Sequence, residues 1–219
     1  MIESFELLAK NIAELEAKVG ARKGFFARLL EEDDWSFVIK LHALFEAACT
    51  HLLLYHFDEP NLSSVIGRLE LSGRSTGKVE MLGKLELLGK EKRRFISSLS
   101  ELRNSLVHDV RNAEFAFEAF VGSLEPKQLR LFAVSFSPYE STIRKFAESP
   151  IFEKNVAPQL IKQAQVESVI DRAKAAPKTH LWLGAYDVLS SILEMYGYSD
   201  YRKWARSDDI FSGEDDGEF

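Results

Sequence analysis

The sequence predicts an all-α protein, and three observations carry that prediction. Apolar residues recur at intervals of three and four along most of the chain, the spacing of one buried helix face. Helix-forming residues are abundant, whereas glycine (12) and proline (6) are sparse among 219 residues. No stretch shows the strict polar–apolar alternation of a half-buried strand. With 46% hydrophobic residues, the chain is long enough to bury a sizeable core.

The first two helices are expected at residues 2–19 and 33–57. Residues 2–19 carry apolar side chains at helical spacing, and Gly20 ends this helix. Residues 33–57 begin with Asp33 or Asp34 as a helix cap and continue as an almost uniformly apolar run. A helix that is apolar all round belongs inside a protein, so we expect 33–57 to form the central, buried helix.

The rest of the chain divides into shorter helical stretches. We expect a helical bundle in residues 1–125, additional C-terminal helices packed on it in residues 126–206, and a disordered acidic tail in residues 207–219. Gly89 is expected to cap the C-terminal end of a helix. The helices expected after residue 57 are 61–71, 76–88, 91–109, 113–124, 126–137, 140–148, 156–174 and 179–197.

Charge is distributed unevenly along the chain. The formal net charge is −6, and the segment after Arg206 accounts for all of it, with six acidic residues and no basic one. Residues 68–111, in contrast, carry ten basic residues against six acidic ones. This local excess of positive charge is compatible with a partner that bears phosphate groups.

Other sequence features exclude several classes of protein. The single Cys49 cannot form an internal disulfide, and its apolar neighbours favour a packed thiol over a nucleophile. The N-terminus lacks the order of a signal peptide, and no run approaches the roughly 18 apolar residues of a membrane span. His42, His51 and His56 do not gather on one helix face with carboxylates. We therefore expect a cytoplasmic protein with no metal, no cofactor and no membrane contact.

Residues 91–109 form the helix with the clearest division into two faces. Arg103 stands between these faces, and its long side chain can reach the polar one. One face is suited to burial, and the other gathers groups that can do chemistry. The apolar face consists of Phe95, Leu99, Leu102 and Leu106, and the polar row opposite consists of Ser97, Glu101, Asn104 and His108.

Glu46 stands out as a carboxylate in the middle of the apolar run 33–57, one turn after His42. A buried charge without a partner costs several kcal/mol, so Glu46 needs a partner. One interpretation is a structural ion pair or hydrogen bond. The other is that Glu46 holds a catalytic Arg or His in place.

The sequence LRNSLVHD at residues 102–109 resembles the signature of the HEPN superfamily, in which an Arg followed by a polar residue precedes a His by four to six intervening residues. Arg103 is followed here by Asn104, and four residues separate Arg103 from His108. The order of segments in residues 60–125 is similar to the mannitol operon repressor branch. The resemblance covers about residues 33–125 and implies a HEPN-like bundle of four to five helices that forms a homodimer. Catalytic members are metal-independent endoribonucleases that use the 2′-hydroxyl of the RNA as the nucleophile.

The residues present suit that chemistry. The imidazole of His108 can transfer a proton near neutral pH, and the guanidinium of Arg103 can grip two phosphate oxygens. Asn104, one turn before His108, can orient the imidazole or bind phosphate. The expected catalytic residues are Arg103, Asn104 and His108, with Glu46 and Glu101 in support. Lys92, Arg93, Arg94 and Arg111 are the expected nucleic-acid-binding residues.

Two functions follow from the resemblance, and a structural interpretation stands beside them. The first is an endoribonuclease of a toxin or defence system, with an antitoxin as partner. The second is a non-enzymatic regulator that acts through protein contacts, since no helix-turn-helix with a basic recognition helix is visible. In the structural interpretation, Arg103 pairs with Glu46 or Glu101, and His108 is a cation favoured at a helix C-terminus.

Overall fold

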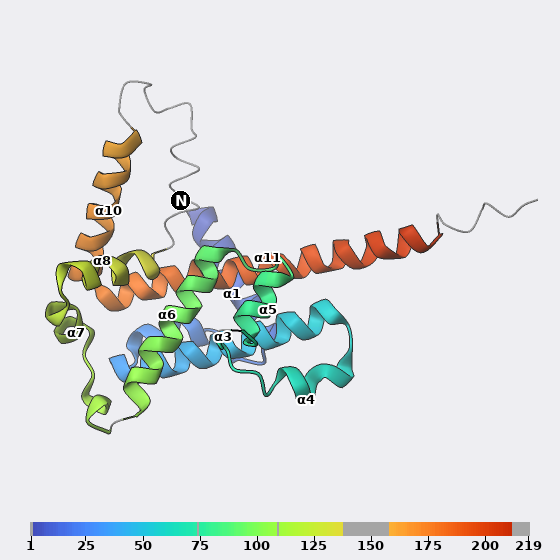
Figure 1. Cartoon of the computed structure of the whole chain (residues 1–219), viewed down its shortest axis with the longest axis horizontal. Helices are drawn as coiled ribbons and strands as arrows, with labels where there is room; N and C mark the ends of the chain where they lie inside the picture. Colours follow the sequence, from blue (N-terminus) through green and yellow to red (C-terminus); the bar gives the residue numbers. More distant parts are fainter. Residues whose placement is uncertain (1, 74, 109, 138–157, 212–219) are drawn as a thin grey trace, which may run out of the picture.

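The computed structural model confirms the all-α class for the residues that it describes. It describes the backbone of residues 2–73, 75–108, 110–137 and 158–211, and side chains within these ranges except 2–9, 110–111, 158–165 and 206–211. No strand occurs in these ranges. The helices (Figure 1) are α1 Ile2–Lys18, α2 Phe25–Arg28, α3 Asp34–Phe57, α4 Ser63–Ile66, α5 Lys78–Lys84, α6 Lys90–Val107, α7 Phe117–Ser123, α8 Pro126–Ser135, α10 Pro158–Ala175 and α11 Pro177–Phe211, with single 3-10 turns at Leu29–Glu31, Pro60–Leu62 and Val110–Glu114.

Helix α3 begins and ends where the sequence predicts, for identifiable reasons. The side chain of Asp33 accepts a hydrogen bond from the backbone N–H of Ser36 at 2.8 Å and so caps the helix. Hydrogen bonds from the side chain and the backbone of Ser36 stabilise the carboxylate form of Asp33 and hold its pKa below the usual value. At the other end, Asp58 adopts a left-handed conformation (φ 55°) that terminates the helix.

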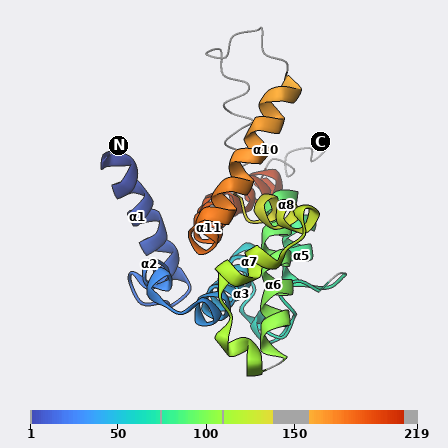
Figure 2. The same cartoon turned by 90° about the vertical axis from the view of Figure 1, so that its left-hand side faces the viewer.

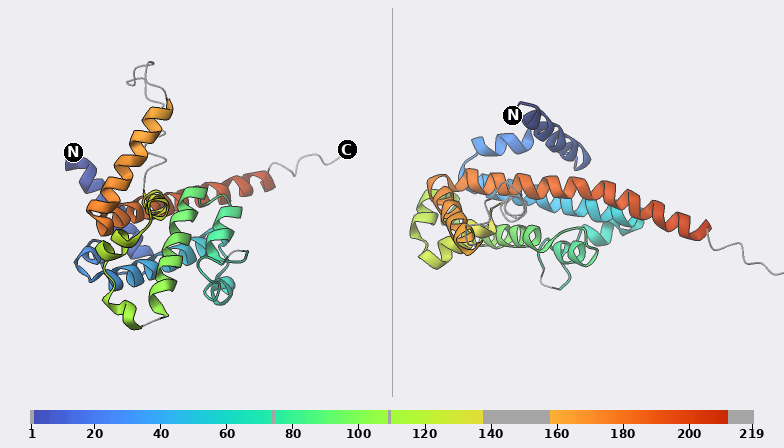
Figure 3. Two further views of the ribbon diagram at one scale, coloured as in Figure 1. Left: turned by 60° about the vertical axis from the view of Figure 1, so that its left-hand side comes forward. Right: turned by 90° about the horizontal axis from the view of Figure 1, so that it is seen from above.

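Helix α3 lies at the centre of the fold with α11 along one side (Figure 3). The two helices run in the same direction. Lys178 of α11 forms an ion pair with Asp34 of α3 (3.2 Å), and near the opposite ends Ser199 lies 3.0 Å from Nδ1 of His56. The C-terminal part of α11 extends beyond the rest of the molecule (Figure 1).

Helix α6 packs on α3 in the opposite direction. The rings of Phe45 and Phe95 lie 5.5 Å apart near the start of α6, and Trp35 contacts the Leu106 carbonyl near its end. The predicted apolar face of α6 is buried against α3, with Phe95 2% exposed and Leu99 fully buried. This part of the sequence prediction is confirmed.

The helices before and after residue 125 share one core. One buried apolar cluster includes residues of α3 and α6 as well as Leu181, Leu189 and Ile192 of α11. Helices α10 and α8 pack together at one end, and α1 lies against α11 (Figure 2). The helices after residue 125 therefore complete the core on which α6 is positioned.

Several helix boundaries differ from the sequence prediction. Gly89 is the N-cap of α6 with an extended backbone (φ −63°, ψ 159°), and the residue with positive φ near the end of α5 is Glu86. The stretches expected at 61–71 and 76–88 contain only short helices, α4 and α5. Helix α11 continues to Phe211, so residues 207–211 are helical where a disordered tail was expected. Residues 212–219 and the helix expected at 140–148 lie outside the described residues.

Helix α3 corrects the expectation that no run approaches a membrane span. By length and composition alone, Asp34–Phe57 is long and apolar enough to cross a membrane. Over half of its most apolar window is buried inside the protein. A buried core helix and a membrane-spanning helix are both apolar on all sides. The apolar run that predicted a central helix therefore also meets the criterion for a membrane span.

Of the other residues singled out on α3, Cys49 and His56 are buried and His51 is half-buried. Cys49 is fully buried, and this burial raises the pKa of its thiol to about 12, as a packed thiol requires. His51 Nδ1 lies 2.8 Å from the Tyr196 hydroxyl, and His56 contacts Ser199. In the part of the chain that the structure describes, no three His, Cys, Asp or Glu residues gather as metal ligands.

Candidate functional site

Three of the four residues of the polar row of α6 are exposed, and the fourth, Ser97, is half-buried. Glu101, Asn104 and His108 are exposed, whereas Arg103 is half-buried at the edge of the row. Because the leucines on the opposite face are held in the core, the polar row stays oriented outward. The row is therefore available to a partner or substrate.

The C-terminal end of α6 is held by side chains from other segments. The last carbonyls of a helix have no partner within the helix. Here the indole N–H of Trp35 donates to the Leu106 carbonyl at 3.5 Å, and the side-chain amide of Asn112 donates to the Ser105 carbonyl at 2.8 Å. These contacts hold the last turn of α6, and His108 is the C-cap residue that follows this turn.

The structure brings Arg103 and Asn104 together but does not join either of them to His108. Nη1 of Arg103 donates to Oδ1 of Asn104 at 3.0 Å. Asn104 therefore orients the guanidinium, whereas the sequence suggested that it could orient the imidazole. Among the described residues, neither Arg103 nor His108 forms an ion pair with a carboxylate, and Glu101 forms none either.

Glu46 is not the buried charge that the sequence suggested. Its side chain is 43% exposed, whereas the side chain of its partner Lys78 is 1% exposed. Nζ of Lys78 lies 3.0 Å from Oε1 of Glu46 and joins α5 to α3. Of the two interpretations of Glu46, this is the structural ion pair. Glu46 is therefore not the partner of Arg103, although it was one of the two partners, with Glu101, that the structural interpretation of Arg103 offered.

The expected nucleic-acid-binding residues at the start of α6 are engaged within the protein. Lys92 pairs with Asp187 of α11, and Arg93 pairs with Glu80 of α5 at 3.3 Å. Nη2 of Arg94 donates to the Val134 carbonyl of α8 at 3.4 Å. These three side chains tie α6 to its neighbours, and the side chain of Arg111 lies outside the described residues.

His42, which was considered from the sequence as a metal ligand, contacts α6 one turn before Arg103. His42 of α3 is half-buried, and its Nε2 lies 3.2 Å from Oγ of Ser100 on α6. Burial, and next the positive charge of Arg103, lower the pKa of His42 below its usual value. The sequence signal for this contact was weak, because it depends on how α3 and α6 pack.

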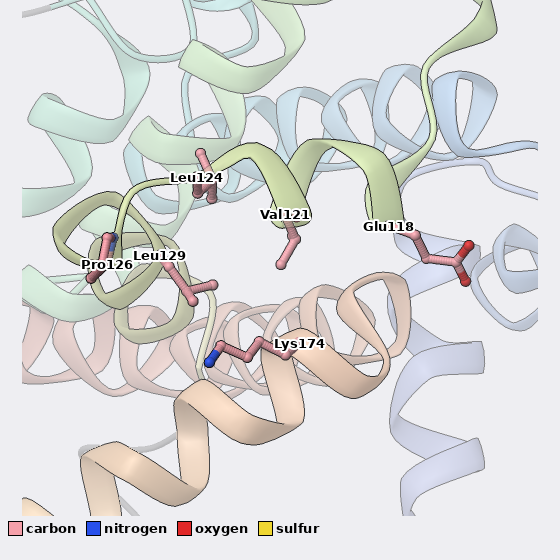
Figure 4. Close-up of a pocket in the computed structure, with 7 residues that line it drawn as sticks. Glu118, Val121, Leu124, Pro126, Leu129 and Lys174 are labelled. Carbon is pink, nitrogen blue, oxygen red and sulfur yellow. The ribbon is translucent and has the colours of Figure 1, made fainter.

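One pocket lies away from the motif. It has a volume of about 370 Å³ and opens between α7, α8 and α10 (Figure 4). None of the residues discussed above lines it, so it is separate from the polar row of α6. Its lining residues are Glu118, Val121, Gly122, Leu124, Pro126, Leu129 and Lys174.

No model of a protein family, no curated protein and no solved structure matches this chain. The case for a function therefore depends on the residues and their geometry.

The lowered pKa values of three histidines lead us to expect that the protein loses stability in mild acid. Burial lowers the pKa values of His42, His51 and His180. As the pH falls through about 6.5, these imidazoles bind protons in the unfolded chain but remain largely neutral in the folded protein. The free energy of unfolding therefore decreases as the pH falls. Urea unfolding at pH 7.5, 6.5 and about 5.5 should give a decreasing free energy of unfolding. A constant value over this range would mean that these imidazoles accept protons as readily in the folded protein.

Proposed function

We propose that this chain is a HEPN-type RNA-binding protein that acts as a metal-independent endoribonuclease, with Arg103, Asn104 and His108 at its site. The observation that carries the proposal is the state of Arg103. Its guanidinium lies at the surface, is oriented by Asn104, and has no carboxylate partner among the described residues. Arg93 and Arg94 on the same helix are, in contrast, tied to neighbouring helices.

The proposed chemistry assigns a separate task to each side chain. Cleavage of RNA by its own 2′-hydroxyl needs a group that moves a proton near neutral pH, and His108 supplies an imidazole at an exposed, fixed helix end. Negative charge then grows on the phosphorus oxygens in the transition state. Arg103 can meet that charge with two parallel N–H donors, because Asn104 occupies only one of its nitrogens in the described structure.

The direct test is incubation of the purified chain with a mixed RNA pool in the presence and absence of EDTA. We expect cleavage in both conditions, because no metal-ligand cluster exists in the described residues. RNA that stays intact in both conditions would exclude the nuclease and favour the regulator.

The proposal includes a homodimer. A second copy of the motif would supply both an acid and a base to one phosphodiester, since no described contact joins Arg103 to His108 within a chain. Sedimentation at tens of micromolar should therefore show a dimer of about 50 kDa for a 24.9 kDa chain. Replacing exposed Glu101 by Arg should weaken that dimer, whereas Glu118→Arg on α7 should not. A monomer at every concentration would contradict the shared cleft.

One observation favours the regulator as a second candidate. Lys92, Arg93 and Arg94 are occupied by contacts inside the protein, so the local excess of basic residues does not form an open basic surface at the start of α6. A regulator that binds another protein needs no such surface. Expression in a host separates the two: a nuclease should slow growth, and His108→Ala should relieve the effect, whereas a regulator should show neither.

A further inference from the structure

His42 has a fixed hydrogen-bonding direction. Oγ of Ser100 lies 3.0 Å from the Ile96 carbonyl and 3.2 Å from Nε2 of His42. A carbonyl oxygen only accepts, so the one hydroxyl proton of Ser100 goes to Ile96. Nε2 of His42 must then carry a hydrogen and donate to Ser100. In a neutral imidazole this leaves Nδ1 as the atom with a lone pair.

Nδ1 of His42 is open to solvent. It has no hydrogen-bond partner among the described residues, and it is absent from the buried polar atoms that lack a partner. The same holds for Nε and Nη2 of Arg103, because Nη1 alone contacts Asn104. Arg103 lies one turn after Ser100, the α6 residue that His42 contacts, so two groups that can bind an anion reach solvent from neighbouring parts of α3 and α6.

Of the two positive charges that act on His42, one has a carboxylate partner and the other has none among the described residues. Arg103 on α6 and Lys78 on α5 both act on His42 as positive charges, and Glu46, one turn further along α3, acts as a negative one. Glu46 is engaged with Lys78 at 3.0 Å. The remaining positive charge belongs to Arg103, and no described carboxylate neutralises it. Burial is the larger cause that keeps His42 uncharged, and an anion beside Arg103 would offset the second cause, the positive charge of Arg103.

We propose that the seam between α3 and α6 is a phosphate-binding subsite in which Arg103 and His42 hold the same phosphate group, and that His42 takes up a proton from solvent when the phosphate binds. The proton adds to Nδ1, and the new N–H donates to a phosphate oxygen while Nε2 keeps its bond to Ser100. The proposal rests on the proposed function for the identity of the phosphate, which would belong to an RNA chain.

His51 provides a matched control within the same helix. It is also half-buried on α3, and burial likewise lowers its pKa. Its Nδ1 is, however, occupied by the Tyr196 hydroxyl at 2.8 Å, and no arginine is among the charges that act on it. Phosphate should therefore leave His51 unchanged.

The test is a pH titration of the five histidines by NMR on the full chain, in chloride, in inorganic phosphate at equal ionic strength, and with a uridine dinucleotide. With phosphate or the dinucleotide, the pKa of His42 should rise by about one unit, at the low end of the effect of a close opposite charge. Arg103→Gln should abolish this response, and His51 should not move. A response to inorganic phosphate without one to the dinucleotide would restrict the subsite to free phosphate.

Three results would overturn the subsite. The first is a pKa of His42 that is the same in chloride and in phosphate. The second is a phosphate-dependent change in pKa at His108 alone. The third is a phosphate-dependent rise in the pKa of His42 that persists in Arg103→Gln. The outcome is separable from that of the nuclease. If RNA stays intact while phosphate raises the pKa of His42, the nuclease fails and the subsite stands. If RNA is cut while His42 does not respond, the subsite fails alone.

Discussion

His108→Ala should lower the rate of RNA cleavage by about 10²–10⁴, the range typical of a positioned acid–base group. Arg103→Lys should lower it by a similar factor of about 10²–10³, because a point charge cannot replace a planar fork on two phosphate oxygens. Single-turnover cleavage of one defined RNA, with enzyme in excess, would measure both variants. Arg130→Lys on the exposed face of α8 is the matched control and should keep the wild-type rate.

Both variants should remain folded. His108 is exposed at the end of α6, and the core contacts of this helix come from its other face. Thermal unfolding of His108→Ala should therefore match the wild type closely. If His108→Ala unfolds the protein, His108 is a structural residue, and the loss of cleavage would carry no information about catalysis.

The second large effect concerns the pair that joins α5 to α3. Glu46→Ala should destabilise the protein by about 2–4 kcal/mol, because it leaves the ammonium of Lys78 buried without its partner. The value lies somewhat below that of a fully buried pair, since Glu46 is 43% exposed and water can enter its place. Urea unfolding of the variant and the wild type gives the difference directly.

Lys78→Met tests whether the unpaired ammonium, and not a loss of side-chain packing, destabilises Glu46→Ala. Methionine keeps most of the volume and removes the buried charge, so its cost should stay below about 1.5 kcal/mol. The double variant Glu46→Ala, Lys78→Met should then be more stable than Glu46→Ala alone. Equal losses in Glu46→Ala and in the double variant would show that the buried ammonium is not the cause.

The long helices could be predicted from the sequence because local signals agree with their tertiary environment. Asp33 supplies a cap, the run to Phe57 is apolar on all sides, and the leucines of α6 repeat at helical spacing. The short helices of residues 58–89 could not. Gly77 permits a close backbone approach there: a Cβ at this position would lie 2.4 Å from the backbone nitrogen of Gly73.

The candidate site was predictable only where it lies on one helix. The exposure of Asn104 and His108 follows from their position opposite Leu99 and Leu106. The contact between His42 and Ser100 joins residues 58 positions apart, and no local spacing indicates it. The sequence likewise marked Glu46 as the isolated charge, whereas packing buries Lys78 instead.

The chemical nature of the RNA ends tests the central claim most directly. If the 2′-hydroxyl attacks the phosphorus with His108 moving the proton and Arg103 holding the charge, the upstream product ends in a 2′,3′-cyclic phosphate and the downstream product begins with a 5′-hydroxyl. Mass spectrometry of a short RNA cut in EDTA should show these two ends. Products with a 5′-phosphate and a 3′-hydroxyl, or cleavage that requires a divalent metal, would contradict the proposed site.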